Sequence, residues 1–179
     1  MSEVLAAPSE RPIVVLDFEA SAMPSRSSYP IEVGVAFVLS GESRSWLIRP
    51  TEQWLQTEQW DPESEKIHGL TKEVLLAEGQ PVDRVRAELA EAAAGHRVLC
   101  DALMADALWL RTLYGGTPAF RLGSVGAVLE ALTAPLGSGG RGALAKAVKL
   151  ASRRFPQAHR AGPDARRLAE VIRILMRLS

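Results

Sequence analysis

The pattern of apolar and polar positions begins with short extended segments and continues with amphipathic helices. Residues 13–18 form a short apolar, β-branched run after Pro12, which predicts a buried strand. Residues 31–39 alternate partly and are rich in valine, and residues 43–48 follow a Ser-Gly-Glu turn. These two segments are therefore predicted to pair as a hairpin. Three strands joined this closely favour an antiparallel start to the sheet.

Helix signals dominate the rest of the chain. Short helices are predicted to open at Asp61-Pro62-Glu63 and at Thr71-Lys72-Glu73, and longer ones to cover 81–94, 105–114 and 124–132. Short extended pieces are expected at 97–100 and 120–122. Pro163 and Asp164 suit the first turn of a last helix, which has a regular apolar stripe. This order of elements predicts one α/β domain with a mixed sheet.

The segment "APLGSGGRG", residues 134–142, is predicted to be a flexible linker. Gly137 to Gly142 matches G-x-G-x-x-G literally, but the segment before it has a helical pattern rather than a strand pattern. The dinucleotide-binding motif requires a strand at that place. Ala143 stands where a phosphate-binding P-loop has lysine, so that motif is excluded as well.

Composition limits the class of protein. The chain has 179 residues, 47% of them hydrophobic and 23% charged, which indicates a globular protein with one domain. No apolar run approaches the length of a membrane span, so no membrane partner is expected. Residues 1–11 are predicted to be a flexible leader without the order of a signal peptide. Cys100 is the only cysteine, which excludes an intrachain disulfide and a thiolate zinc site. A cytoplasmic location is expected.

The charge is balanced overall but not along the chain. Twenty-one basic residues face 21 acidic ones, which argues against binding nucleic acid through bulk positive charge. From Arg141 onward, however, ten basic residues accompany only Asp164 and Glu170. This asymmetry indicates either a surface that faces phosphates or a solvated helical face.

Two carboxylates stand at the end of the first predicted strand, in "PIVVLDFEAS". Asp17 and Glu19 are two residues apart, so within a strand their side chains lie on the same face. Neighbouring carboxylates repel each other, and a divalent cation with a preference for oxygen ligands removes that conflict. The alternative is that the strand ends at Phe18 and Glu19 is merely solvated.

Three more residues are candidates for acid–base or metal chemistry. Asp106 opens the helix predicted at 105–114, and Asp164 opens the last helix; each could simply complement a helix dipole. Asp101 is a rival of Asp106 because it is nearer the end of a strand. His159 lies in a polar segment before the last helix, where its side chain is placed to titrate near neutral pH.

The order of these features resembles the DEDDh group of 3′–5′ exonucleases, the superfamily of ribonuclease T and the ε subunit of DNA polymerase III. The resemblance rests on Asp17-x-Glu19, on "IHGLT" at 67–71, on "DALWL" at 106–110 and on His159-x₄-Asp164. The second of the Asp-containing motifs favours Asp106 over Asp101. The resemblance implies a ribonuclease H-like α/β fold: a mixed five-stranded sheet, three antiparallel strands and then two parallel ones, flanked by helices. Residues 12–179 would form a single exonuclease domain.

The resemblance also implies an activity. It indicates a metal-dependent exonuclease that shortens single-stranded or short DNA or RNA from the 3′ end and releases nucleoside 5′-monophosphates. Two Mg²⁺ or Mn²⁺ ions would be held by four carboxylates, those of Asp17, Glu19, Asp106 and Asp164, with His159 as the general base. The substrate would contact Phe18, Ala20, Ser21, His68 and Leu70.

Two further expectations follow from the resemblance. Related exonucleases such as ribonuclease T are dimers, so a homodimer is one expectation. The run Ala20-Ser21-Ala22 departs from the family, which often has Thr or Ser and then Gly after the Glu. The alternative function is therefore a catalytically inactive nucleic-acid-binding or interaction subunit that keeps the exonuclease fold.

Overall fold

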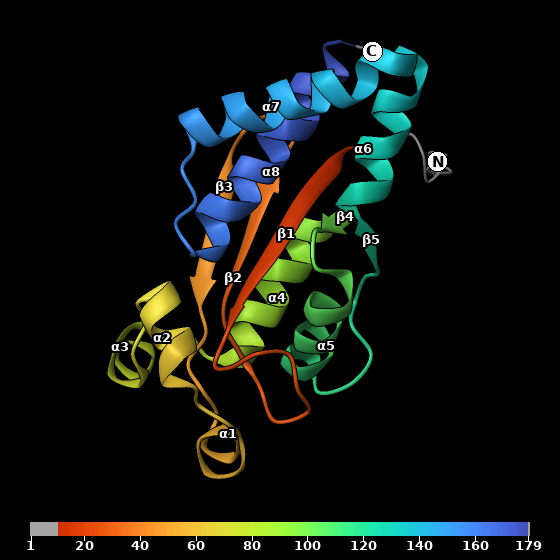
Figure 1. Cartoon of the computed structure of the whole chain (residues 1–179). Coiled ribbons are helices and arrows are strands. Elements are labelled where there is room, and N and C mark those ends of the chain that lie inside the picture. Colours follow the sequence, from red (N-terminus) through yellow and green to blue (C-terminus); the bar gives the residue numbers. More distant parts are fainter. Residues whose placement is uncertain (1–10, 179) are drawn as a thin grey trace, which may run out of the picture.

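A mixed five-stranded sheet forms the centre of the molecule in the computed structural model, which describes residues 11–178 (Figure 1). The strand order is β3-β2-β1-β4-β5. The bounds are β1 Ile13–Ala20, β2 Pro30–Phe37, β3 Ser43–Leu47, β4 Arg97–Cys100 and β5 Leu122–Ser124. The first three strands pair antiparallel, and β4 and β5 continue the sheet in parallel with β1. The predicted α/β fold class, with its ribonuclease H-like sheet, is confirmed.

Eight α-helices and one 3₁₀-helix are found in residues 11–178. Their bounds are α1 Glu52–Thr57, α2 Pro62–His68, α3 Lys72–Glu78, α4 Val82–Ala93, α5 Leu103–Tyr114, α6 Val125–Thr133, α7 Gly140–Arg154 and α8 Ala161–Met176, with the 3₁₀-helix at Ala134–Gly139. The side chains of Thr51, Asp61 and Thr71 accept a backbone N–H at the starts of α1, α2 and α3. These N-caps explain why the short helices begin where they do.

Helices cover both faces of the sheet. On one face, Val85 and Leu89 of α4 and Trp109 and Leu113 of α5 share a core with Leu16 of β1. On the other face, Ala165 and Ile172 of α8 pack against Val15 of β1. Consecutive residues of β1 thus point to opposite faces, as a strand buried on both sides requires.

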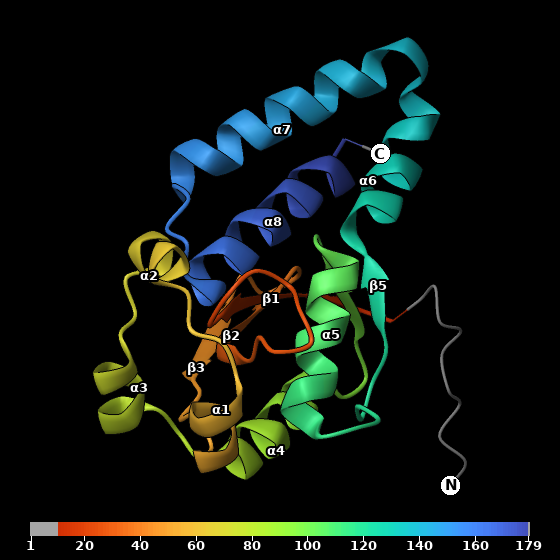
Figure 2. The same ribbon diagram turned by 60° about the horizontal axis from the view of Figure 1, so that its bottom comes forward.

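The prediction of a flexible linker at 134–142 is wrong. Residues 134–139 form the 3₁₀-helix, and Gly140 already begins α7, which runs alongside α8 (Figure 2). Ala147 and Ala151 of α7 pack against Val171 and Leu175 of α8, so a small-residue stripe holds the helix in place. Gly140 permits the sharp entry, because a methyl group there would lie 2.6 Å from the Thr133 carbonyl oxygen.

Two other sequence predictions concern the ends of the chain and the membrane. Residues 1–10 of the predicted leader lie outside the described residues. Within residues 11–178, no helix combines the length and the apolar character that crossing a bilayer demands.

Candidate active site

The last part of β1 carries the two predicted carboxylates on one face. Val15 is buried under α8, and Asp17 and Glu19 follow it at intervals of two, so all three point to the α8 side of the sheet. Asp17 is paired with Gly34 of β2, and Glu19 with Glu32. Since β1 continues to Ala20, the alternative in which the strand ends at Phe18 is wrong.

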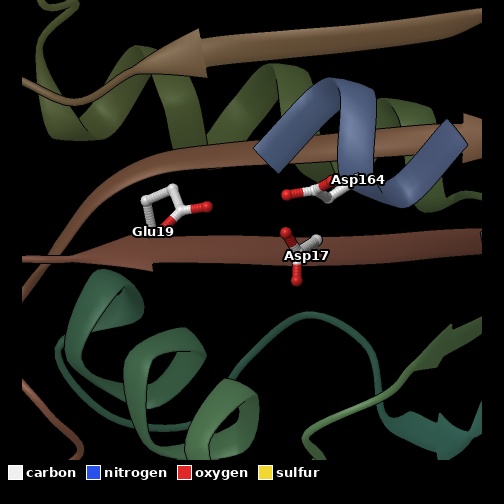
Figure 3. A group of neighbouring side chains, drawn as sticks. All are labelled: Asp17, Glu19 and Asp164. Atoms are coloured by element: carbon white, nitrogen blue, oxygen red, sulfur yellow. The ribbon is translucent and has the colours of Figure 1, made fainter. Parts of the chain in front are cut away.

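The first turn of α8 brings a third carboxylate to the same place. Asp164 is 6% exposed, and its carboxylate lies opposite that of Asp17, with Glu19 on the same side of β1 (Figure 3). One carboxylate oxygen from each of these residues lies within 4.8 Å of the other two. The structure thus brings together residues that are almost 150 positions apart in sequence.

Asp106 lies close to this group on the opposite side of β1. It belongs to the first turn of α5 and is 1% exposed. Its charge raises the pKa of Asp17, second only to the effect of burial. Its Oδ2 atom is buried without a hydrogen-bond partner among the described residues. Asp101, the rival candidate, is exposed at the end of β4.

The electrostatics of the group are unfavourable without a cation. Burial and then the Asp106 charge raise the pKa of Asp17 well above its usual value. Burial, and after it the Glu32 carboxylate, raises the pKa of Glu19 to about 7. Burial raises the pKa of Asp106 to about 6. Clustered, desolvated carboxylates with raised pKa values indicate a functional site more often than a structural one.

The donor set fits a divalent cation. All its ligand atoms are carboxylate oxygens, which Mg²⁺ and Mn²⁺ prefer. The partnerless Oδ2 of Asp106 is a buried acceptor that an ion or its hydration water would satisfy. Asp17, Glu19 and Asp164 could hold an ion directly, with Asp106 beside them.

His159 lies in the loop between α7 and α8, and its side chain is exposed. Its backbone has a φ of +48°, in the left-handed region that residues with a Cβ seldom adopt. The neighbouring Ala158 donates its N–H to Asp164 Oδ1 at 3.2 Å. This hydrogen bond ties the His159 loop to the carboxylate group.

A pocket of about 160 Å³ adjoins Glu19. Its lining includes three of the predicted substrate residues, Phe18, Ala20 and His68, together with Trp109. His68 is buried at the end of α2; its Nδ1 accepts the Leu70 N–H at 3.0 Å, and its Nε2 has no partner among the described residues. Nδ1 is therefore the acceptor, and the ring proton is placed on Nε2.

Ser21 and Leu70 lie elsewhere. Ser21 is fully buried, and its Oγ accepts the Tyr29 N–H at 3.0 Å, so it closes the loop between β1 and β2. Leu70 is 4% exposed and belongs to the core. The structure places neither residue in the lining of the pocket.

Sequence reasoning missed one buried ion pair of this region. Glu32 on β2 is 1% exposed and forms two hydrogen bonds with Arg160, directly after His159. A lone glutamate inside the apolar strand "PIEVGVAF" was the available signal. Its partner is 128 positions away, so spacing could not supply it.

The basic residues after Arg141 are partly neutralised within the protein. Arg160 pairs with Glu32, Arg167 lies 3.6 Å from Asp164, and both Arg154 and Arg173 pair with Glu170. Arg154 and Arg166 also contact the ring of Phe155. Much of this charge therefore serves to hold α7, α8 and the sheet together.

Comparison with solved structures identifies the fold. Exonuclease I from Methylocaldum szegediense matches with a TM-score of 0.68 and 16% identity over 93% of this chain. The chain has the fold of exonuclease I. Escherichia coli exonuclease I in complex with a dA16 oligonucleotide matches with a TM-score of 0.67 and 12% identity over 94% of the chain. Its zinc-bound complex with single-stranded DNA gives a TM-score of 0.69 at 12% identity and 94% coverage.

These exonuclease I structures are much longer proteins. The chain spans 40% of the Methylocaldum enzyme and 41% of each Escherichia coli structure named above. No protein-family model and no curated protein matches the sequence. The likeness to exonuclease I is therefore one of fold.

Proposed function

We propose that the chain is a divalent-metal-dependent 3′–5′ exonuclease acting on single-stranded nucleic acid. The observation that carries the proposal is the group formed by Asp17, Glu19 and Asp164, whose carboxylate oxygens lie within 4.8 Å of one another. The fold shared with exonuclease I supports it, because solved structures of that enzyme hold single-stranded DNA.

The carboxylates would hold two Mg²⁺ or Mn²⁺ ions, Asp17, Glu19 and Asp164 directly and Asp106 mainly through water. Bound there, divalent ions would neutralise the scissile phosphate, assist ionisation of the attacking water and stabilise the leaving 3′-oxygen. The chain contributes the placement. Asp17 and Glu19 are fixed by a strand that is paired on both sides, and Asp164 by the first turn of a long helix.

His159 would act as general base. Its imidazole is exposed and belongs to a loop that is tied to Asp164 by the Ala158 N–H. An unperturbed histidine takes up a proton near neutral pH, so it can accept one from the attacking water. The proton would be passed on to solvent from the exposed ring.

The pocket beside Glu19 would receive the terminal nucleotide. Phe18, Ala20 and Trp109 supply an apolar lining, and the buried Nε2–H of His68 supplies one donor. Burial lowers the pKa of His68, so the ring stays neutral and keeps this donor. Met23 and Ile67, which are 74% and 58% exposed, also line the pocket and could stack on a base.

A labelled oligonucleotide tests the proposal. A 5′-labelled single-stranded DNA or RNA, incubated with the protein and Mn²⁺ or Mg²⁺, should give a ladder that shortens from the 3′ end. EDTA and Asp17→Asn should each abolish the ladder. Strand binding that persists in EDTA, with no shortening under any metal, would instead support an inactive binding subunit.

A further inference from the structure

One buried carboxylate attaches the His159 loop to the sheet. Glu32 accepts from Arg160 Nε at 2.8 Å through Oε2 and from Arg160 Nη2 at 3.0 Å through Oε1. Oε2 also accepts the backbone N–H of Ala161 at 3.1 Å. Both oxygens are used, and the pairing is bidentate and charge-assisted, which fixes direction as well as distance. Glu32 thereby caps the start of α8 from a neighbouring strand.

His159 lies between two fixed neighbours. On one side Ala158 donates to Asp164, and on the other Arg160 is bound to Glu32. The backbone of His159, with φ at +48°, is in the left-handed conformation, which is disfavoured for a residue with a side chain because Cβ then crowds the following carbonyl oxygen. The bonds of the two neighbours offset this penalty, whereas the imidazole remains exposed and accessible to substrate.

We propose that Glu32 and Arg160 are positioning residues, which hold the backbone of His159 in its left-handed conformation and so fix the imidazole for its work as general base. The inference rests on the proposed nuclease function. Two competing roles for Glu32 lead to different results. Glu32 could serve only to anchor α8, or it could act on the metal ligands through Glu19, the residue paired with it across the strands.

Glu32→Gln is the primary variant, because it keeps the shape and an acceptor for Ala161 but removes the charge that binds Arg160. We expect kcat on a single-stranded oligonucleotide to fall about 10- to 100-fold, with KM little changed. Glu170→Gln is the matched control. Glu170 is also buried on the α8 side and also pairs with arginines, Arg154 and Arg173, but not with the His159 loop. Its kcat should equal that of the wild type.

A double-mutant cycle separates the positioning of His159 from both competing roles. His159→Asn tolerates the left-handed backbone and removes the base. If Glu32 acts through His159, then Glu32→Gln should cause no further loss of kcat in the His159→Asn background. A full additional loss there would overturn the proposal, and so would a shift in the Mn²⁺ concentration required by Glu32→Gln, which would indicate an effect through Glu19.

Amide hydrogen exchange tests the inference even if the wild-type protein proves to have no nuclease activity. Exchange at Ala158, His159, Arg160 and Ala161 should accelerate at least about tenfold in Glu32→Gln and not in Glu170→Gln. Unchanged exchange would overturn the proposal. Should Glu32→Gln fail to fold, Arg160→Lys keeps the charge and loses the bidentate geometry, and the same changes in kcat and exchange are expected.

Discussion

Gly34 of β2 lies directly against the backbone of Ala161, the first residue of α8. A methyl group on Gly34 would be 2.3 Å from the Ala161 carbonyl carbon, far closer than non-bonded atoms approach. Because Gly34 is also the strand partner of Asp17, the absence of a side chain there lets the helix that carries Asp164 approach the carboxylates of β1. Close packing of a helix on a strand is thus a condition for the candidate site.

Gly34→Ala should therefore displace the start of α8. We expect a loss of about 1–3 kcal/mol in the free energy of unfolding, as for other overpacked positions, together with weaker Mn²⁺ binding. Urea denaturation and calorimetric metal titration measure the two effects. Gly142→Ala is the control: it lies in α7, a methyl group meets nothing within 4 Å, and helix propensity predicts a small gain in stability. Unaltered metal affinity in Gly34→Ala would contradict the prediction.

Asp106 and Asp101 should differ sharply in their effect on activity. Asp106 is 1% exposed and influences Asp17, whereas Asp101 is exposed. We expect Asp106→Asn to lower kcat/KM at least about 100-fold, because the loss of transition-state charge stabilisation costs several kcal/mol. Asp101→Asn should retain nearly full activity. The comparison is made by initial rates of oligonucleotide shortening, and an equal loss in both variants would show that Asp106 has no special function.

The carboxylate group should make the stability of the metal-free protein depend on pH. The folded protein raises the pKa of Glu19 from 4.5 to about 7 and that of Asp106 from 3.8 to about 6. Between these values the folded state binds more protons than the unfolded state. The contribution of these groups to the free energy of unfolding therefore falls as pH rises from about 4 to about 7.

Thermal denaturation in EDTA across this range, for wild type and Glu19→Gln, measures that contribution. The melting temperature of the wild type should decline relative to the variant as pH rises, and Mn²⁺ should restore more stability at about pH 7.5 than at about pH 5. A wild type that gains stability relative to Glu19→Gln over the same range would contradict the assignment.

The exposed apolar residues of the pocket should matter for substrate and not for folding. Met23 and Ile67 are 74% and 58% exposed, so truncation removes little buried area. Met23→Ala and Ile67→Ala should each raise KM for an oligonucleotide about 5- to 30-fold if a base stacks there, at about 1–2 kcal/mol, and leave the melting temperature unchanged. Leu39→Ala, at an equally exposed apolar residue that does not line this pocket, is the control.

The sheet and most helices could be predicted from local patterns. The β-branched run at 13–18, the hairpin turn, and the caps at Asp61 and Thr71 each act over a few residues, so their signals are contiguous. The helix α7 was missed because its first residues are glycines, which normally oppose helix formation. Its stability comes from packing of Ala147 and Ala151 on α8, which no local pattern reports.

The candidate site divides in the same way. Asp17 and Glu19 were predicted from their spacing on a strand, and Asp106, His159 and Asp164 from the order of motifs. Glu32 was not found, because a single glutamate in a strand gives no direction for its partner. The left-handed backbone of His159 was equally hidden, since it depends on bonds made by Ala158 and Arg160 to two different elements.

The close approach of α8 to the sheet has a consequence for when the site can exist during folding. Residue 17 and residue 164 meet only after α8 has docked, so the group is completed by one of the most non-local contacts of the chain. A folding intermediate with its first three strands formed would carry Asp17 and Glu19 without their third partner. Such a chain could already touch nucleic acid, but it would lack the means to cut it.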